Sequence, residues 1–120
     1  MTVRRLTVVL AVLAVAVGIT ASSVFAGQSR TQLATVNVTA KDFKFLLSAK
    51  SAKAGKIKFV LKNTGNAPHD FKIGSKAPTA RVTKGKSTSI VVTLKRGTYK
   101  YICTVPGHAA LGMKGTFRVL

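Results

Sequence analysis

The chain has 120 residues, enough for one modest domain and too few for two. Lysine and arginine number 20 against two acidic residues, so the formal net charge is +18 and an anionic partner is favoured over a cationic one. Hydrophobic residues make up 47% of the chain, which is enough to build a packed core.

The first 26 residues have the three parts of a secretory signal peptide. Arg4 and Arg5 form a short basic region, an apolar run covers residues 6–19, and small or polar residues follow up to Ala26. A membrane span needs about 20 apolar residues, so this shorter run favours cleavage after Ala26 over a permanent anchor. We therefore expect a mature protein exported to the periplasm, the cell surface or the extracellular space.

From residue 35 onward the sequence follows the period of β-strands. Residues 27–34 are small and polar and are expected to form a short linker. Apolar residues then alternate with polar ones in short runs separated by turn residues, which predicts about seven strands and an all-β sandwich at 35–120. Residues 76–83 show no period and are expected to form a loop or an edge. The expected strands, in chain order, contain Val36 and Val38; Phe43, Phe45 and Leu47; Ile57, Phe59 and Leu61; Phe71 and Ile73; Ile90, Val92 and Leu94; residues 98–103; and residues 115–120.

The single cysteine is unusual for an exported protein. Such proteins normally have even numbers of cysteines joined in disulfides, so a lone thiol is buried and inert, paired with another chain, or a metal ligand. Cys103 is followed by His108 and Met113 in the pattern Cys-x4-His-x4-Met. Pro106 and two glycines lie in this connection, so it can fold tightly and direct all three side chains at one point.

The other histidine, His69, completes a set of soft and borderline metal donors. Two imidazoles, a thiolate and a weak axial thioether are the donors of a type 1, or blue, copper site. Zinc is disfavoured because methionine is a poor zinc ligand. Each residue alone has a structural explanation, namely a core methionine, an inert thiol or a structural histidine. Jointly, the order and spacing of Cys103, His108 and Met113 favour copper.

Residues 66–71 and 101–116 resemble two motifs of small cupredoxins of the plastocyanin, azurin and auracyanin kind. The resemblance extends over residues 35–120. It implies a Greek-key β-sandwich in which His69, Cys103, His108 and Met113 bind one copper ion, with Met113 as the axial ligand. The four residues between Cys103 and His108 are closer to azurin and auracyanin than to plastocyanin, which has two.

Two positions depart from the family pattern. Asp70 stands where many relatives have asparagine, and we expect its carboxylate to accept a hydrogen bond from a backbone N–H of the cysteine loop. Asp70 would then tune the site without binding the metal. Ile102 stands where relatives often have an aromatic residue implicated in a second electron route, so that route is disfavoured here.

The function that this resemblance implies is one-electron transfer between redox partners, without catalysis by the protein itself. The alternative is a copper-binding protein for delivery or storage in the cell envelope, although a buried mixed-donor site argues against easy metal exchange. A copper enzyme needs further histidine ligands, and the chain has only two histidines. A metal-free adhesin leaves the Cys-His-Met motif unexplained.

The charge of the chain sets the expected partners. Cleavage after Ala26 removes Arg4 and Arg5 and leaves 94 residues with a net charge of +16. We expect acidic redox proteins as partners, or an anionic membrane or cell-wall surface. Nucleic acid is disfavoured by export and by the spread of lysines along the whole chain. We expect the protein to be a monomer.

Overall fold

The computed structural model describes residues 11–18 and 33–120. The chain divides into two units, Met1–Arg30 and Thr31–Leu120. Residues 11–18 contain no helix or strand, and the expected cleavage site after Ala26 lies outside the described residues. In these two described stretches, no helix is long and apolar enough to cross a membrane.

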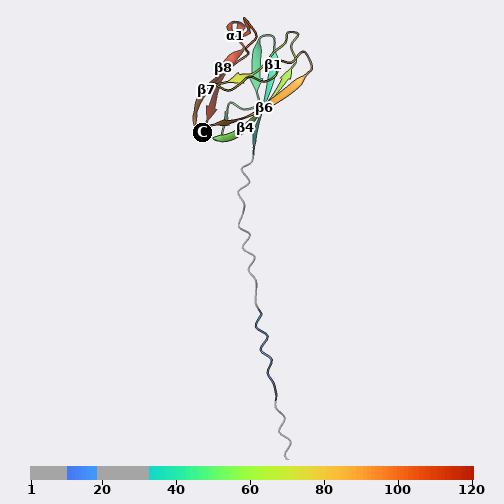
Figure 1. The fold of residues 1–120 in the computed structure, drawn as a ribbon, viewed down its shortest axis with the longest axis vertical. Coiled ribbons are helices and arrows are strands. Elements are labelled where there is room, and N and C mark those ends of the chain that lie inside the picture. The colour runs from blue at the N-terminus through green and yellow to red at the C-terminus, as the bar shows by residue number, and fades with distance from the viewer. Residues whose placement is uncertain (1–10, 19–32) are drawn as a thin grey trace, which may run out of the picture. The chain divides into compact units, whose positions relative to one another are not determined.

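The second unit consists almost entirely of β-strands (Figure 1). The only helix in its described part is a single turn, α1, which lies at the end of the strands opposite the C-terminus. The elements are β1 (Ala34–Lys41), β2 (Lys44–Leu47), β3 (Ser51–Ala52), β4 (Gly55–Asn63), β5 (Lys72–Ile73), β6 (Ser87–Leu94), β7 (Gly97–Ile102), α1 (His108–Leu111) and β8 (Lys114–Val119).

The strands form two sheets of four, in the orders β2-β1-β4-β6 and β3-β8-β7-β5. The expected Greek-key β-sandwich is confirmed, with eight described strands in place of about seven because the two-residue β3 is too short to show a period in the sequence. Four strand pairs are antiparallel, but β1 pairs with β4, and β3 with β8, in parallel. The parallel pairs arise because the chain leaves one sheet and returns to it between the paired strands.

Strand β4 shows why alternation produces this core. Ile57, Phe59 and Leu61 are fully buried. Lys56 and Lys62 on either side of this run are exposed, and Lys58 and Val60 within it are half-buried. Period-two alternation directs one set of side chains inward and the other toward solvent. The ring centre of Phe59 lies 5.3 Å from that of Phe117 in the opposite sheet and 5.2 Å from that of Phe71.

One expected strand boundary needs correction, and one expected loop is confirmed. Phe43 does not belong to the second strand, because Lys41 pairs with Lys44 and the chain reverses through Asp42 and Phe43. The stretch 76–83 is a loop as expected, and it is anchored at two points. Thr79 is buried and bonds the backbone of residue 71, and Val82 forms a β-bridge with His69.

The turn into β7 is fixed by a side chain rather than by backbone bonds alone. The hydroxyl of Tyr99 donates a hydrogen bond of 2.7 Å to the carbonyl oxygen of Lys95. This is the tyrosine corner of Greek-key sandwiches, in which a tyrosine ties down the connection between the sheets. The bond lies just before the strand that ends at the cysteine, so it holds the base of β7.

Replacing Tyr99 with phenylalanine removes only this hydrogen bond. We expect the free energy of unfolding to fall by about 1 kcal/mol, the net value of one such bond. Urea denaturation of the metal-free protein measures the change. Unchanged stability would contradict the structural role of the hydroxyl. The visible spectrum of the copper-loaded variant should not change, because the hydroxyl bonds Lys95 and Tyr99 is outside the donor cluster.

Candidate metal centre

The loop from Cys103 to Met113 is closed by its own backbone. The N–H of Cys103 donates to the carbonyl of Met113 at 3.0 Å, and the N–H of Met113 donates to the carbonyl of His108 at 3.1 Å. Gly107 and Gly112 flank the single turn of α1 with φ angles of 83° and 126°, which only glycine adopts without strain. The sequence therefore folds this segment into a compact loop that returns Met113 to the level of Cys103.

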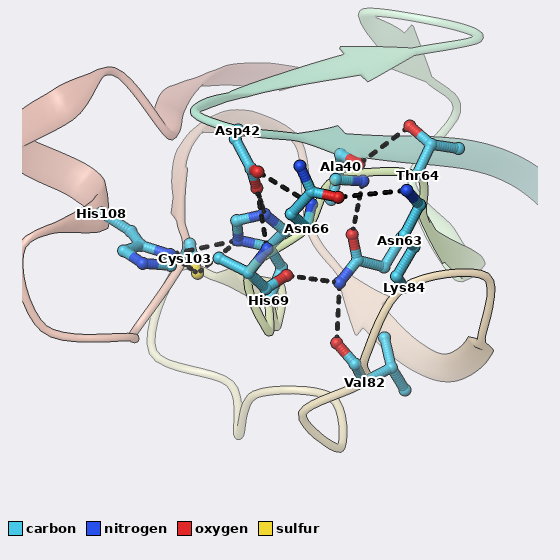
Figure 2. Close-up of polar contacts among 12 residues, drawn as sticks. Ala40, Asp42, Asn63, Thr64, Asn66, His69, Val82, Lys84, Cys103 and His108 are labelled. Carbon is cyan, nitrogen blue, oxygen red and sulfur yellow. Dashed lines mark hydrogen bonds and ion pairs between the residues drawn. The ribbon is translucent and has the colours of Figure 1, made fainter.

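His69 is held by the loop that follows β4 and by the bridge to Val82. The backbone of His69 exchanges two hydrogen bonds with Val82, at 3.0 and 2.9 Å. The buried side chain of Asn63 donates to the carbonyls of Ala67 and Val82, both at 2.8 Å, and accepts from the N–H of Gly65 (Figure 2). These bonds fix the segment before His69, so its imidazole enters the site in one orientation.

Three of the expected metal donors converge on one point. His69 Nδ1 lies 3.1 Å from His108 Nδ1 and 4.0 Å from the sulfur of Cys103, which is 3.7 Å from His108 Nδ1. Figure 2 shows the sulfur between the two imidazole rings. These three residues are the cluster of potential metal ligands that the described part of the chain contains.

The spacing of these atoms fits a single metal ion. Bonds of about 2.0–2.3 Å from a metal to nitrogen and sulfur place ligands roughly 3–4 Å apart when the angles at the metal are about 100–120°. Two imidazoles with one thiolate, in trigonal arrangement, are the equatorial ligands of a type 1 copper site. Met113 adds the thioether: its side chain is fully buried, and its backbone is bonded to both Cys103 and His108.

The protonation of the donors suits a metal. Burial raises the pKa of the Cys103 thiol, so the thiol keeps its proton until a cation displaces it. Burial, with a further contribution from His69, lowers the pKa of His108 and keeps this imidazole neutral. A neutral imidazole has a free lone pair, which is the form that binds metals.

Asp70 braces the cysteine loop in the manner expected from the sequence. One carboxylate oxygen accepts the backbone N–H of Thr104 at 2.6 Å, and the other accepts the Thr104 hydroxyl at 2.5 Å. The guanidinium of Arg81 lies 3.5 Å from the same carboxylate. Asp70 thus fixes the residue directly after Cys103, and its two hydrogen bonds are with the loop.

Sequence reasoning missed Asp42, which contacts a histidine of the site. One oxygen of this carboxylate lies 2.7 Å from His69 Nε2, and the carboxylate also accepts the backbone N–H groups of Asn66 and Ala67. The bond from Asn66 is the main reason that the pKa of Asp42 lies below its usual value, so the carboxylate is ionised at neutral pH. One feature of the sequence could have pointed to Asp42: acidic residues are rare here, since Asp42 and Asp70 are the only two in the chain.

Comparison with known proteins assigns the class. Residues 8–117 match the family model of the cupredoxin-like domain. Over 42 residues the chain is 52% identical to auracyanin-B of Chloroflexus aurantiacus, a match that covers 34% of this chain and 18% of that protein. The chain thus spans about a fifth of the length of that curated relative.

Solved structures agree with the fold. Dithionite-reduced auracyanin from Roseiflexus castenholzii superposes with a TM-score of 0.63 at 23% identity, covering 72% of this chain and 96% of that one. Auracyanin A of Chloroflexus aurantiacus, described as a "blue" copper protein, gives a TM-score of 0.61 at 19% identity, with 72% and 98% covered.

The sandwich and its Cys-His-His-Met cluster define the class of blue copper proteins. The chain belongs to the cupredoxin-like domain family. Copper is the cofactor that its donors fit, and His69, Cys103, His108 and Met113 are the residues that would hold it. Bound copper supplies one-electron redox chemistry, and proteins of this class are in general electron carriers.

Cys103→Ser tests the ligand set directly. We expect wild-type protein with one equivalent of Cu(II) to show an intense thiolate-to-copper absorption band near roughly 600 nm, and the variant to lack it, because serine supplies no thiolate. Absorption spectroscopy with copper analysis makes the measurement. A band that persists in Cys103→Ser would refute the assignment.

Asp70→Asn separates tuning from metal binding. The amide oxygen still accepts the Thr104 N–H, and the amide nitrogen can donate to the Thr104 hydroxyl, so the loop keeps its brace. We therefore expect unchanged copper stoichiometry and colour, with a higher reduction potential because a negative charge that favours Cu(II) is lost. Spectroelectrochemical titration gives the potential. Loss of stoichiometric copper would show instead that Asp70 is a ligand or is essential to the fold.

Proposed function

We propose that this protein is an exported one-electron carrier whose electrons pass through His108 to and from acidic redox partners. The observation that supports this most is the unequal exposure of the copper ligands. His69, Cys103 and Met113 are at most 1% exposed, whereas His108 is partly exposed. The imidazole of His108 is therefore the shortest connection between the metal and the surface.

The surroundings of His108 suit brief protein contact. Pro106, Ala110 and Leu111 of the same loop are exposed, and Leu111 is 63% exposed. A small apolar surface permits close approach with few polar groups to desolvate, which favours a short-lived complex. Short-lived complexes are what an electron carrier needs, since it must leave each partner after one electron.

The chain's own residues prepare the site for electron transfer. The donors are held by bonds within the protein that do not involve the metal. These are the Cys103–Met113 backbone bond, the Asp70 bonds to Thr104 and the Val82 bridge to His69. A frame of this kind keeps the donors in similar positions in both oxidation states. Small rearrangement lowers the barrier to electron exchange.

Copper delivery or storage is the second candidate, and burial disfavours it. A delivery protein must pass its metal to another protein by ligand exchange, which requires accessible donors. Three of the four donors here are buried, so exchange would require the loop to open. Catalysis by a multicopper centre is also disfavoured, since both histidines of the chain are already in this site.

The basic residues support an acidic partner. Lysines and arginines are exposed on both sheets, for example Lys56 and Lys62 on β4, Lys100 on β7, and Lys114 and Arg118 on β8. Charge complementarity raises the rate of encounter more than it raises affinity. Export, for which the first 26 residues are the support, would bring this surface to envelope redox proteins or to the anionic envelope itself.

We expect electron exchange with an acidic redox protein to be fast at low salt and to slow as salt rises. The Debye length falls from about 30 Å at 0.01 M to about 10 Å at 0.1 M, so attraction between separated exposed charges is screened over this range. Stopped-flow measurement of the bimolecular rate provides the test.

Two controls complete the measurement. A basic redox protein should react more slowly at low salt and gain rate as salt rises, and a small uncharged electron donor should show neither trend. The reduction potential is recorded across the same salt range. A constant potential shows that a change in rate comes from electrostatic steering of the encounter and not from a change in the driving force for electron transfer. Equal, salt-independent rates with acidic and basic proteins would refute electrostatic steering.

A further inference from the structure

Both acidic residues of this strongly basic chain lie at the metal site. Asp70 bonds Thr104, next to Cys103, and Asp42 bonds the ring of His69. The 20 basic residues are spread over the sequence and far outnumber them. Acidic side chains are thus confined to the two positions where they contact a metal ligand or its immediate neighbour.

The contact of Asp42 with His69 determines which ring nitrogen faces the metal. The Asp42 oxygen lies 2.7 Å from His69 Nε2, and an ionised carboxylate only accepts, so Nε2 has the proton and donates it. The lone pair is then on Nδ1, the atom that lies 3.1 Å from His108 Nδ1. Figure 2 shows the carboxylate on one side of the His69 ring and the sulfur of Cys103 on the other.

The turn between β1 and β2 is built around this carboxylate. The Lys41–Lys44 pair makes the reversal two residues long, and the backbone N–H groups of Asn66 and Ala67 bond the carboxylate at 2.8 and 3.3 Å. Gly65 approaches so closely that a Cβ there would lie 2.9 Å from the backbone nitrogen of Asp42 and would overlap its side chain. The loop leading to His69 therefore has a glycine where it crosses Asp42.

The charge of Asp42 acts on the metal through the shared proton. A carboxylate that accepts the outer N–H of a ligating imidazole raises the basicity of the ligand, which stabilises the more highly charged metal ion. The side chain of Asp42 is 25% exposed and that of His69 is fully buried, so solvent screens this pair less than it screens the exposed lysines. The positive field of the basic surface favours Cu(I). The carboxylate of Asp42 opposes this field and favours Cu(II).

We propose that Asp42 is a positioning residue of the copper site, which fixes the Nδ1-binding tautomer of His69 and biases the copper toward Cu(II). The inference rests on the proposed copper function. It goes beyond that function by assigning the control of potential to a residue that is neither a ligand nor part of the Cys103–Met113 loop.

The metal-free protein provides the first test. In wild type, NMR of the His69 Nε2–H should show a slowly exchanging proton at low field, because it is buried and bonded to a carboxylate. In Asp42→Ala, exchange should be at least about tenfold faster, the factor expected from loss of a charge-assisted hydrogen bond. Asp42→Asn should keep the signal at higher field, because its amide oxygen still accepts the proton. An unchanged signal in Asp42→Ala would overturn the proposal.

The copper-loaded protein provides the second test. In Asp42→Asn, the ratio of Cu(II) to Cu(I) affinity should fall about tenfold, at the lower end of the effect of such partners on metal affinity. For a one-electron couple this factor is an increase in potential of about 59 mV. Lys41→Gln is the matched control, since it changes the charge of the preceding exposed residue by one unit without touching His69.

The control and the variant should differ in sign and size. Lys41→Gln should change the affinity ratio less than about twofold, because an exposed charge is screened, and in favour of Cu(II). Potentials for Asp42→Asn equal to wild type, or shifts of equal size for the two variants, would overturn the proposal. Circular dichroism verifies folding; should Asp42→Ala fail to fold, Asp42→Asn decides, because it retains the acceptor for His69.

Failure of the proposed function would look different. Wild-type protein without a thiolate-to-copper band would refute copper binding, and a wild-type protein that holds copper but exchanges no electrons would refute the carrier function. Neither result depends on Asp42. Conversely, a normal carrier whose potential and His69 proton are both insensitive to Asp42 would refute only the role proposed for Asp42.

Discussion

The structure depends on holding three metal donors from two distant loops within 4.0 Å of one another. A buried thiol and two imidazoles have no tendency to gather on their own, since each loses water when it is buried. The backbone bond from Cys103 to Met113 and the bridge from His69 to Val82 impose the arrangement. The two β-sheets provide the rigid frame from which these loops extend.

Hydrogen bonds from both backbone and side chains hold the site. Backbone bonds close the Cys103 loop, while Asn63, Asp42 and Asp70 tie the three connecting loops to one another. Among the described residues, no buried side-chain polar atom is left without a partner. A fully satisfied network of this kind has few alternative arrangements, so it defines one geometry for the donors.

The parts that sequence predicts well are those whose signal is local. Alternation in residues 57–61 marks β4, and the spacing from Cys103 to Met113 marks three donors, because both patterns depend on neighbours along the chain. The contact of Asp42 with His69 joins residues 27 positions apart through a two-residue turn, and no local period encodes it. Phe43 illustrates the same limit. It fits the alternation of β2, yet it lies in the turn with its ring centre 5.0 Å from that of His108.

Attraction to acidic partners and the balance between Cu(I) and Cu(II) both depend on the charge of the protein, and the distribution of charge in this chain separates them. Adding lysines to a small protein strengthens attraction to acidic partners and, by the same field, favours Cu(I) over Cu(II). Exposed charges act at long range in dilute salt but are screened within about 10 Å at 0.1 M, whereas a carboxylate hydrogen-bonded to a buried ligand is screened less. Asp42, through His69, and Asp70, through Thr104, are in this second position. In the roles proposed for them, the two carboxylates set the balance of oxidation states at the metal, and the basic surface is then free to vary with the partner.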